Sequence, residues 1–468
     1  MLIDFSFSNF KSFRARQNFS TKRDDGWSSD APYGTVAAVY GGNAAGKSNF
    51  VDALEYVNRF VRKSFVTAAD EAGTGRSPYR LDLSGPSEKS VFVVRFDVES
   101  SGEYEYEFSV DDDVVWYERL QRWGSSRPSK VFERQTTETK NGYEIRVTYG
   151  KAFRGPRAVY EKALRENALL LSVLASAGNE SIADAFDFLA RRIHVYRASA
   201  YGGEMDNVAS YMQEDPKRAQ ALQTLVRGTG LGISGIELDS SMQEQLLGHL
   251  STAADKERVR NFYSATVDLA AADIPASERS DMVDKLMRAE ILEGTIPRQL
   301  VFGHEGEKGT VFFKKRDESE GTIAAISFLS VALRDLSSQS VTVVDEIDSS
   351  LHPSMVRALV NLYQDALTNP HDSQLIFTTH DVSLLMQSID GGDTLMPDQV
   401  WLVEKRSGRS ELYPVTEYGV TSDENMARNY LNGQYDGVPQ PTLREAFALA
   451  LEILGGTGGK GGDSGAEE

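Results

Sequence analysis

The chain has 468 residues, of which 40% are hydrophobic and 25% are charged, and this balance is typical of a globular protein with two or three hydrophobic cores. Its 69 acidic and 50 basic residues give a formal net charge of −19, so the overall field repels nucleic acid and anionic lipid. The sequence contains no cysteine, which excludes disulfides and thiolate sites and favours a reducing compartment.

The first residues predict a strand rather than a targeting segment. Residues 1–7 alternate between apolar and polar side chains and lack the basic stretch that opens a secretory leader. No part of the sequence contains about 18 uninterrupted apolar residues, which a membrane-spanning helix needs. We therefore expect a cytoplasmic protein that makes no use of a membrane.

A phosphate-binding loop (P-loop) is predicted between an apolar strand at 35–40 and an amphipathic helix. The small residues at 41–46 allow backbone N–H groups to surround a phosphate chain, Lys47 can reach the terminal phosphates, and Ser48 can bind Mg²⁺. A glycine turn that matches this motif by chance is the alternative, but the strand before and the helix after favour a nucleotide site. The predicted nucleotide-binding residues here are Gly41, Asn43, Ala44, Ala45, Gly46, Lys47, Ser48 and Asn49.

Strands dominate the rest of the first segment, which we place at residues 1–151. The candidates have aromatic or β-branched residues at alternate positions and predict an antiparallel sheet. They are residues 91–96, 104–108, 114–117 and 143–147. Residues 68–90 are rich in Gly, Ser and Pro, so we expect a loop there that a ligand or a partner orders.

Helical spacing replaces the strand pattern in residues 152–297. Apolar residues recur three and four positions apart in three groups. The groups are Leu164, Ala168, Leu171 and Ala175; Ile182, Phe186 and Leu189; and Leu246, Leu250, Val259, Phe262 and Val267. Pro275 and Pro297 interrupt the stretch and no heptad repeat persists, so a long coiled coil is not expected. We expect a helical insertion that serves contacts with a second copy or another partner.

Acidic residues and a histidine follow two apolar strands in the last ordered segment, 298–454. The strands, 341–344 and 374–378, are continuous runs of the kind found in parallel sheets covered on both faces. Asp345 ends the first strand and is a candidate to hold Mg²⁺ through water, and Glu346 is a candidate base for the attacking water. His380 follows the second strand and could contact the terminal phosphate or the water. Solvated turn residues are the alternative, which the strongly apolar strands disfavour.

A helix is predicted to begin at Ser319, within the sequence Glu-Ser-Glu-Gly-Thr at 318–322. Ser319 can cap this helix, and the N–H groups near Glu320 and Gly321 can then bind a phosphate that another subunit presents. By itself the segment is only a helix start.

A hairpin and a helix are expected to close the ordered chain. The hairpin joins residues 400–403 and 411–413, and one side of the helix carries Leu443, Phe447, Leu451 and Leu454. Residues 455–468 are Gly, Ser and acidic residues, so we expect a disordered tail.

The order of these motifs resembles one class of ATPases. The motifs are the P-loop, Ser-Glu-Gly-Thr at 319–322, Val-Val-Asp-Glu-Ile-Asp at 343–348, Ser-Leu-His-Pro at 350–353 and Thr-Thr-His-Asp at 378–381. They resemble the ABC-type ATPases of the SMC and RecF class. Within this class they are similar to the stand-alone bacterial AAA ATPases that resemble the OLD (overcoming lysogenisation defect) ATPase domain. ATPases of this kind are found in anti-phage defence. Asn-Phe-Lys-Ser-Phe at 9–13 matches the N-terminal motif of that class, and residues 232–237 and 430–433 resemble further landmarks.

The resemblance implies an α/β fold, namely an ABC-type P-loop ATPase head with a mixed central sheet, an antiparallel N-terminal β-subdomain and a helical insertion. It implies ATP and Mg²⁺ as cofactors and a homodimer or higher oligomer. The implied roles are nucleotide binding for Lys11 and Ser12, metal binding for Ser48 and Asp345, catalysis for Glu346 and His380, the D-loop for Asp348 and Ser349, and a signature acting in trans for Ser319, Glu320 and Gly321.

Two features depart from the wider ABC pattern. The signature is not the Leu-Ser-Gly-Gly-Gln of transporters, and no glutamine is placed in the Q-loop, for which Glu118 and Gln121 are the candidates.

Three functions are compatible with these motifs. The favoured one is an ATP-driven dimerising switch in anti-phage defence, and the others are a RecF-like DNA-binding repair ATPase and the motor of a membrane transporter. The signature and the long insertion disfavour the transporter, and the acidic charge means that DNA could bind only at a local basic patch.

About 90 residues follow His380, which is too few for a nuclease domain after the closing hairpin and helix, so a separate effector protein, such as a nuclease, is expected.

Overall fold

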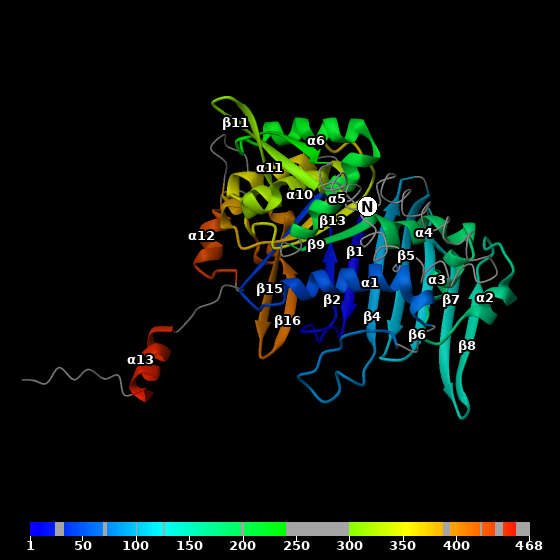
Figure 1. The fold of residues 1–468 in the computed structure, drawn as a ribbon. Coiled ribbons are helices and arrows are strands. Elements are labelled where there is room, and N and C mark those ends of the chain that lie inside the picture. The colour runs from blue at the N-terminus through cyan, green and yellow to red at the C-terminus, as the bar shows by residue number, and fades with distance from the viewer. Residues whose placement is uncertain are drawn as a thin grey trace, which may run out of the picture.

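Two sheets with a helix between them form the body of the protein, and a computed structural model describes most of the chain (Figure 1). The described residues are 1–23, 32–68, 73–99, 101–124, 127–197, 201–239, 299–386, 394–421, 424–435 and 443–454. Of these two large sheets, one is antiparallel and N-terminal and the other is mixed, and the described residues also form a three-stranded antiparallel sheet. The predicted α/β fold class is confirmed.

The antiparallel sheet has seven strands in the order β2-β1-β4-β5-β6-β7-β8. They are β1 (Leu2–Ser8), β2 (Gln17–Ser20), β4 (Ser90–Val98), β5 (Gly102–Val110), β6 (Val115–Trp123), β7 (Pro128–Thr139) and β8 (Gly142–Tyr149). The four strands predicted after the P-loop correspond to β4, β5, β6 and β8. β7 was not predicted, because Val131 and Phe132 are adjacent and most of its other residues are polar.

The mixed sheet has six strands in the order β16-β15-β3-β14-β13-β9, of which only β16 is antiparallel to its neighbour. They are β3 (Val36–Gly41), β9 (Ile193–Arg197), β13 (Val341–Asp345), β14 (Gln374–Thr378), β15 (Val400–Arg406) and β16 (Arg409–Pro414). β15 and β16 form the predicted hairpin. Because β14 pairs with both β3 and β13, the carboxyl ends of these three strands lie side by side.

Helices cover both faces of the mixed sheet. On one face Ala37 and Val39 of β3 contact the core around α1 (Lys47–Thr67), which also includes the inner face of the antiparallel sheet. On the other face Val36, Ala38 and Tyr40 contact a second core. The helices of that core are α5 (Tyr201–Glu214), α6 (Pro216–Gly228), α10 (Glu320–Asp335), α11 (Pro353–Gln364) and α12 (Met426–Leu431). The alternation along β3 follows from the two-residue period of a strand.

Two strands lie in the stretch 152–297, where we expected only helices. β9 extends the mixed sheet, and β10 (Ile233–Asp239) pairs with β11 (Gln299–Gly306), which pairs with β12 (Gly309–Lys314). β9 was not predicted because its sequence, Ile-His-Val-Tyr-Arg, is short and polar at alternate positions, and the residues around it have helical spacing. The third helical group and both prolines lie outside the described residues, as does the tail, and the proposed domain division stays a prediction.

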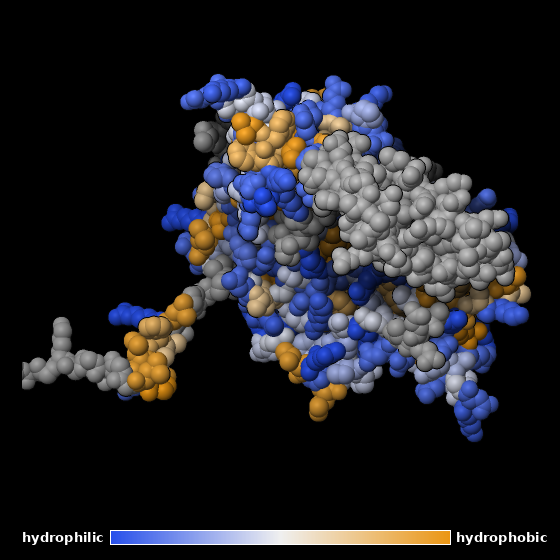
Figure 2. Space-filling model, viewed as in Figure 1, coloured by the Kyte–Doolittle hydropathy of each residue, from blue (hydrophilic) through white to orange (hydrophobic). Residues whose placement is uncertain are grey.

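Small helices complete the N-terminal half and the end of the chain. They include α2 (Arg157–Ala163), α3 (Leu170–Ser176), α4 (Ala183–Asp187) and α13 (Leu443–Ile453). The predicted closing helix is therefore present as α13, and its apolar side chains are exposed, as Figure 2 shows. None of the helices within the described ranges combines the length and the apolar character that crossing a membrane requires.

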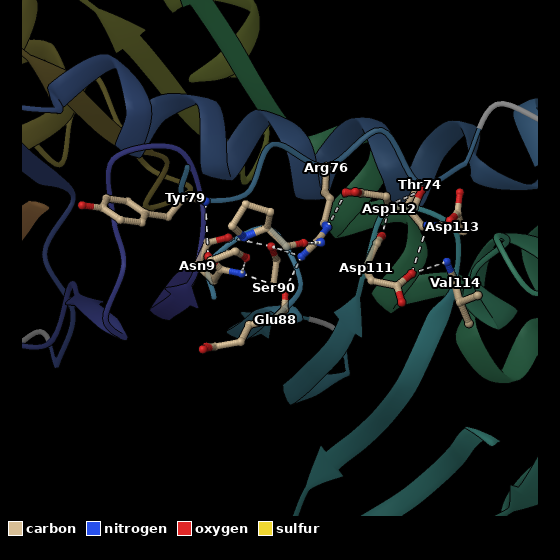
Figure 3. A network of polar contacts seen from close by, with 12 residues as sticks. Asn9, Thr74, Arg76, Tyr79, Glu88, Ser90, Asp111, Asp112, Asp113 and Val114 are labelled. Atoms are coloured by element: carbon tan, nitrogen blue, oxygen red, sulfur yellow. Dashed lines mark hydrogen bonds and ion pairs between the residues drawn. The ribbon is translucent and has the colours of Figure 1, made fainter. Parts of the chain in front are cut away.

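Internal polar contacts hold the loop before β4, which we expected a ligand or partner to order (Figure 3). The Arg76 guanidinium is 1% exposed, forms an ion pair with Asp112 at 2.7 Å and donates to the carbonyl of Pro86 at 2.6 Å. The Asn9 amide donates to the carbonyl of Gly85 at 2.8 Å. These contacts tie the loop to the N-terminal motif at residues 9–13.

Replacing the buried guanidinium tests this account. Arg76→Ala should lower the free energy of unfolding by about 2–4 kcal/mol, because it leaves the carbonyl of Pro86 without its donor and the carbonyl of Glu88 with Asn9 as its remaining donor. Urea unfolding measures the change. The control is Arg316→Ala, whose surface guanidinium lies 3.7 Å from Asp317 and should contribute less than about 0.5 kcal/mol. A loss for Arg76→Ala as small as that of the control would contradict the role of the network.

Candidate nucleotide-binding site

The residues predicted to act on nucleotide come together at the carboxyl edge of the mixed sheet. The P-loop follows β3, Asp345 ends β13, and His380 lies two residues after β14. The Lys47 ammonium donates to the carbonyls of Gly41 at 2.9 Å and Gly42 at 3.3 Å, and lies 2.9 Å from His380 Nε2. The P-loop and His380, which the sequence predicts separately, therefore meet at one amine.

Glycine is required at both ends of the P-loop. A Cβ on Gly41 would lie 2.3 Å from the carbonyl oxygen of Val403, and a Cβ on Gly46 would lie 2.6 Å from Ser410 Oγ. Gly46 also has φ +126°, which side chains rarely adopt. Since Gly46 precedes α1 and has no side chain to cap it, the first-turn N–H groups are available to an anion.

Burial sets the charge states of the two basic groups. It lowers the pKa of the Lys47 ammonium from its ordinary value of 10.5, and the nearby carboxylates of Glu346 and Asp345 oppose this. Burial, and next the charge of Lys47, lower the pKa of His380 below its ordinary 6.5. At neutral pH His380 is therefore uncharged, and its Nε2 can accept a hydrogen bond from Lys47.

Asp345 and Ser48 provide two oxygen ligands that fit Mg²⁺. Ser48 Oγ donates to Asp345 Oδ1 at 3.3 Å, and the hydroxyl of the buried Thr378 donates to the same oxygen at 2.7 Å. Carboxylate and hydroxyl oxygens suit this ion, which takes its remaining ligands from phosphate and water. These two side chains would hold Mg²⁺, which would offset the charge of the phosphates.

Thr378 also positions Glu346. The Glu346 N–H donates to Thr378 Oγ1 at 2.7 Å, and Glu346 has φ 59° in the left-handed region. This conformation costs free energy in a residue other than glycine and marks a position that its surroundings hold in place. Next to it, Asp348 Oδ2 accepts from the His380 N–H at 3.2 Å, and Ser349 N–H donates to the Glu346 carbonyl at 2.9 Å.

The N-terminal motif contacts the first turns of α1. The Lys11 ammonium forms an ion pair with Asp52. Ser12 Oγ accepts from the Asn49 amide at 2.7 Å and from Ser410 Oγ at 2.7 Å. Lys11 and Ser12 therefore lie beside the P-loop and its helix.

The signature segment lies elsewhere in the same chain. Ser319 caps α10 by accepting from Thr322 N–H at 3.1 Å, and Glu320 is exposed in the first turn. A Cβ on Gly321 would lie 2.7 Å from the carbonyl oxygen of Ser350. The segment thus lies beside the end of the D-loop of its own chain, and its role in trans stays a prediction.

Neither Q-loop candidate lies at this edge, because both belong to β6 of the antiparallel sheet. The fully buried Glu118 carboxylate accepts from the N–H groups of Leu170 at 2.6 Å and Leu171 at 2.9 Å, so it caps α3. Burial raises its pKa, against the opposing charge of Arg134. Arg197 at the end of β9 also lies next to Asp345, with Nη1 3.3 Å from Asp345 Oδ2. Sequence reasoning missed Arg197 because it missed β9.

Comparison with known proteins places the chain in a family. A family model described as "AAA domain, putative AbiEii toxin, Type IV TA system" matches residues 36–386, which is most of the chain and includes the P-loop, Asp345 and His380. No curated protein sequence matches significantly.

Two solved structures of SMC heads align over most of the chain. One is an SMC head bound to the C-terminal winged-helix domain of ScpA, with 14% identity and a TM-score of 0.41, covering 88% of this chain and 96% of that chain. The other is the SMC head domain from Thermotoga maritima, with 14% identity and a TM-score of 0.37, covering 88% of this chain and 98% of that chain.

The two hydrogen bonds of Thr378 lead to a test. Thr378→Val keeps the shape of the side chain but removes the hydroxyl that bonds to Asp345 Oδ1 and to the Glu346 N–H. This variant should lower the free energy of unfolding by about 1–3 kcal/mol and weaken Mg²⁺-dependent nucleotide binding. Urea unfolding and titration with a fluorescent ATP analogue, with Mg²⁺ or with EDTA, measure the two effects.

The control for this variant is Thr342→Val. Thr342 is equally buried, and its hydroxyl donates to Asp335 at 2.8 Å, away from the P-loop. It should lose stability without a change in nucleotide binding. Equal effects of the two variants on Mg²⁺-dependent binding would contradict the site.

Proposed function

The chain belongs to this AAA domain family, and from that premise we propose that it is an ATP-binding and ATP-hydrolysing enzyme that works as a dimerising switch. The observation that carries the proposal is the meeting of Lys47, His380, Ser48 and Asp345 at one edge of the mixed sheet. Together they supply a cation, a neutral imidazole and two metal ligands, which phosphoryl transfer from ATP to water requires.

Each residue has a role that its position supports. Lys47 exchanges its hydrogen bonds to Gly41 and His380 for the terminal phosphates, whose negative charge favours the protonated amine. Ser48 and Asp345 hold Mg²⁺. Glu346 orients and polarises the attacking water, and His380 donates or accepts a hydrogen bond at the transferred phosphoryl group.

A second copy of the chain would complete the site. Lys47 of the P-loop lies beside His380, and Asn49 of α1 lies beside Ser12 of the N-terminal motif, whereas Gly321 lies next to Ser350 at the end of the D-loop. The N–H groups at the start of α10 can therefore reach a nucleotide that a second copy holds. This arrangement makes dimer formation depend on bound ATP.

We further propose that the switch acts in anti-phage defence and controls a separate effector, such as a nuclease, in the cytoplasm. The description of the family as a toxin of a toxin–antitoxin system supports a role of this kind. A RecF-like repair ATPase is the alternative outcome, and salt-sensitive binding of duplex DNA by the purified protein would favour it.

Two variants of the site test the enzyme activity. Lys47→Ala should weaken ATP binding by about 10–100-fold, because it removes the charged donor. Glu346→Gln should keep ATP binding, lower turnover by about 10²–10⁴-fold and accumulate the ATP-bound dimer. Phosphate release and analytical ultracentrifugation with ATP and Mg²⁺ measure these changes. Wild-type turnover by Glu346→Gln would remove Glu346 from the mechanism, and absence of turnover in the wild type would contradict the proposed function.

A further inference from the structure

An arginine that the proposed mechanism does not use lies beside the candidate metal ligand. Arg197 is the last residue of β9 and is the register partner of Asp345, the last residue of β13. Its Nη1 lies 3.3 Å from Asp345 Oδ2, while Asp345 Oδ1 accepts from Thr378 and Ser48. Both oxygens of the carboxylate therefore have partners, and one of them is held by a cation.

The same guanidinium also contacts α1. Arg197 Nη2 lies 2.5 Å from Asp52 Oδ1 and 2.5 Å from Glu55 Oε2. Ser48, Asp52 and Glu55 are spaced by four and three residues, so they share one face of α1. Arg197 thereby joins the strand that ends in Asp345 to the helix that carries Ser48.

We propose that Arg197 is a positioning residue that keeps Mg²⁺ from binding to Asp345 until nucleotide is present. This inference rests on the proposed nucleotide site. A guanidinium stays charged at all accessible pH values, so it repels a divalent cation from the carboxylate that it contacts. The negative phosphates of a bound nucleotide offset this repulsion. Metal and nucleotide would then bind together, and Asp345 would hold the metal in place of its contact with Arg197.

The fold does not depend on this guanidinium alone. The Arg197 side chain is 33% exposed, and Asp345 keeps its hydrogen bonds from Thr378 and Ser48 when the guanidinium is removed. Asp52 keeps a second partner, the Lys11 ammonium. We therefore expect Arg197 variants to fold, and their thermal unfolding midpoints verify it.

The test measures binding of Mn²⁺, which substitutes for Mg²⁺ and is detected by electron paramagnetic resonance. Full-length wild-type protein and Arg197→Gln are titrated with Mn²⁺, with and without a non-hydrolysable ATP analogue. Without nucleotide, Arg197→Gln should bind Mn²⁺ about fivefold more tightly or better than the wild type, because a positive charge is removed next to the ligand. With nucleotide the difference should shrink.

Two further variants separate charge from structure. Arg197→Lys keeps the positive charge and should stay within about twofold of the wild type. Arg192→Gln is the matched control, since Arg192 precedes β9 and pairs with Asp187 at 2.7 Å, without contact to the site. It should not change Mn²⁺ binding.

The outcomes are distinct. Unchanged or weaker Mn²⁺ binding by folded Arg197→Gln overturns the inference. An increase in the Mn²⁺ affinity of Arg197→Lys as large as that of Arg197→Gln also overturns it. A wild-type protein that binds neither the ATP analogue nor Mn²⁺ contradicts the proposed function itself, and with it the inference.

Discussion

Parallel pairing of β3, β14 and β13 is the constraint on which the candidate site depends. The register joins Val39 to Thr378 and Val344 to Phe377, so the three strands end at the same level. That level is where the chain leaves the sheet into the P-loop, Glu346 and His380. The side chains of these strands are buried on both faces, and packing against the two cores holds the strands at this level.

A buried ammonium gives the site its electrostatic character. Lys47 is 6% exposed, and among the described residues two backbone carbonyls and the neutral His380 accept its hydrogen bonds. Burying a cation is costly unless an anion offsets it, and the carboxylates of Glu346, Asp345 and Asp348 offset the burial only in part, since the pKa of Lys47 is still lowered. A phosphate chain in the loop would supply that anion. The folded chain thus retains an unbalanced charge that favours nucleotide binding.

The sequence predicts the parts of the fold whose signals are local and strong. The P-loop, the strands before Asp345 and His380, and the β15–β16 hairpin are continuous apolar runs or short motifs, and all of them form as expected. β7 and β9 were missed because polar residues interrupt their patterns. Arg197 and Thr378 could not be assigned roles, since their contacts join strands that are far apart in the sequence. The ordering of the loop around Arg76 depends on Asp112, which comes from a different element, and spacing alone does not reveal that pairing.

We propose that the P-loop of one chain and the signature of another form one catalytic site. The most direct measurement is ATP turnover by a mixture of Lys47→Ala and Ser319→Arg proteins, each inactive alone. A mixed dimer retains one intact P-loop opposite one intact signature, so a 1:1 mixture should recover roughly a quarter of the wild-type rate. A mixture that stays as inactive as its two components, although ultracentrifugation shows that mixed dimers form, would contradict the account.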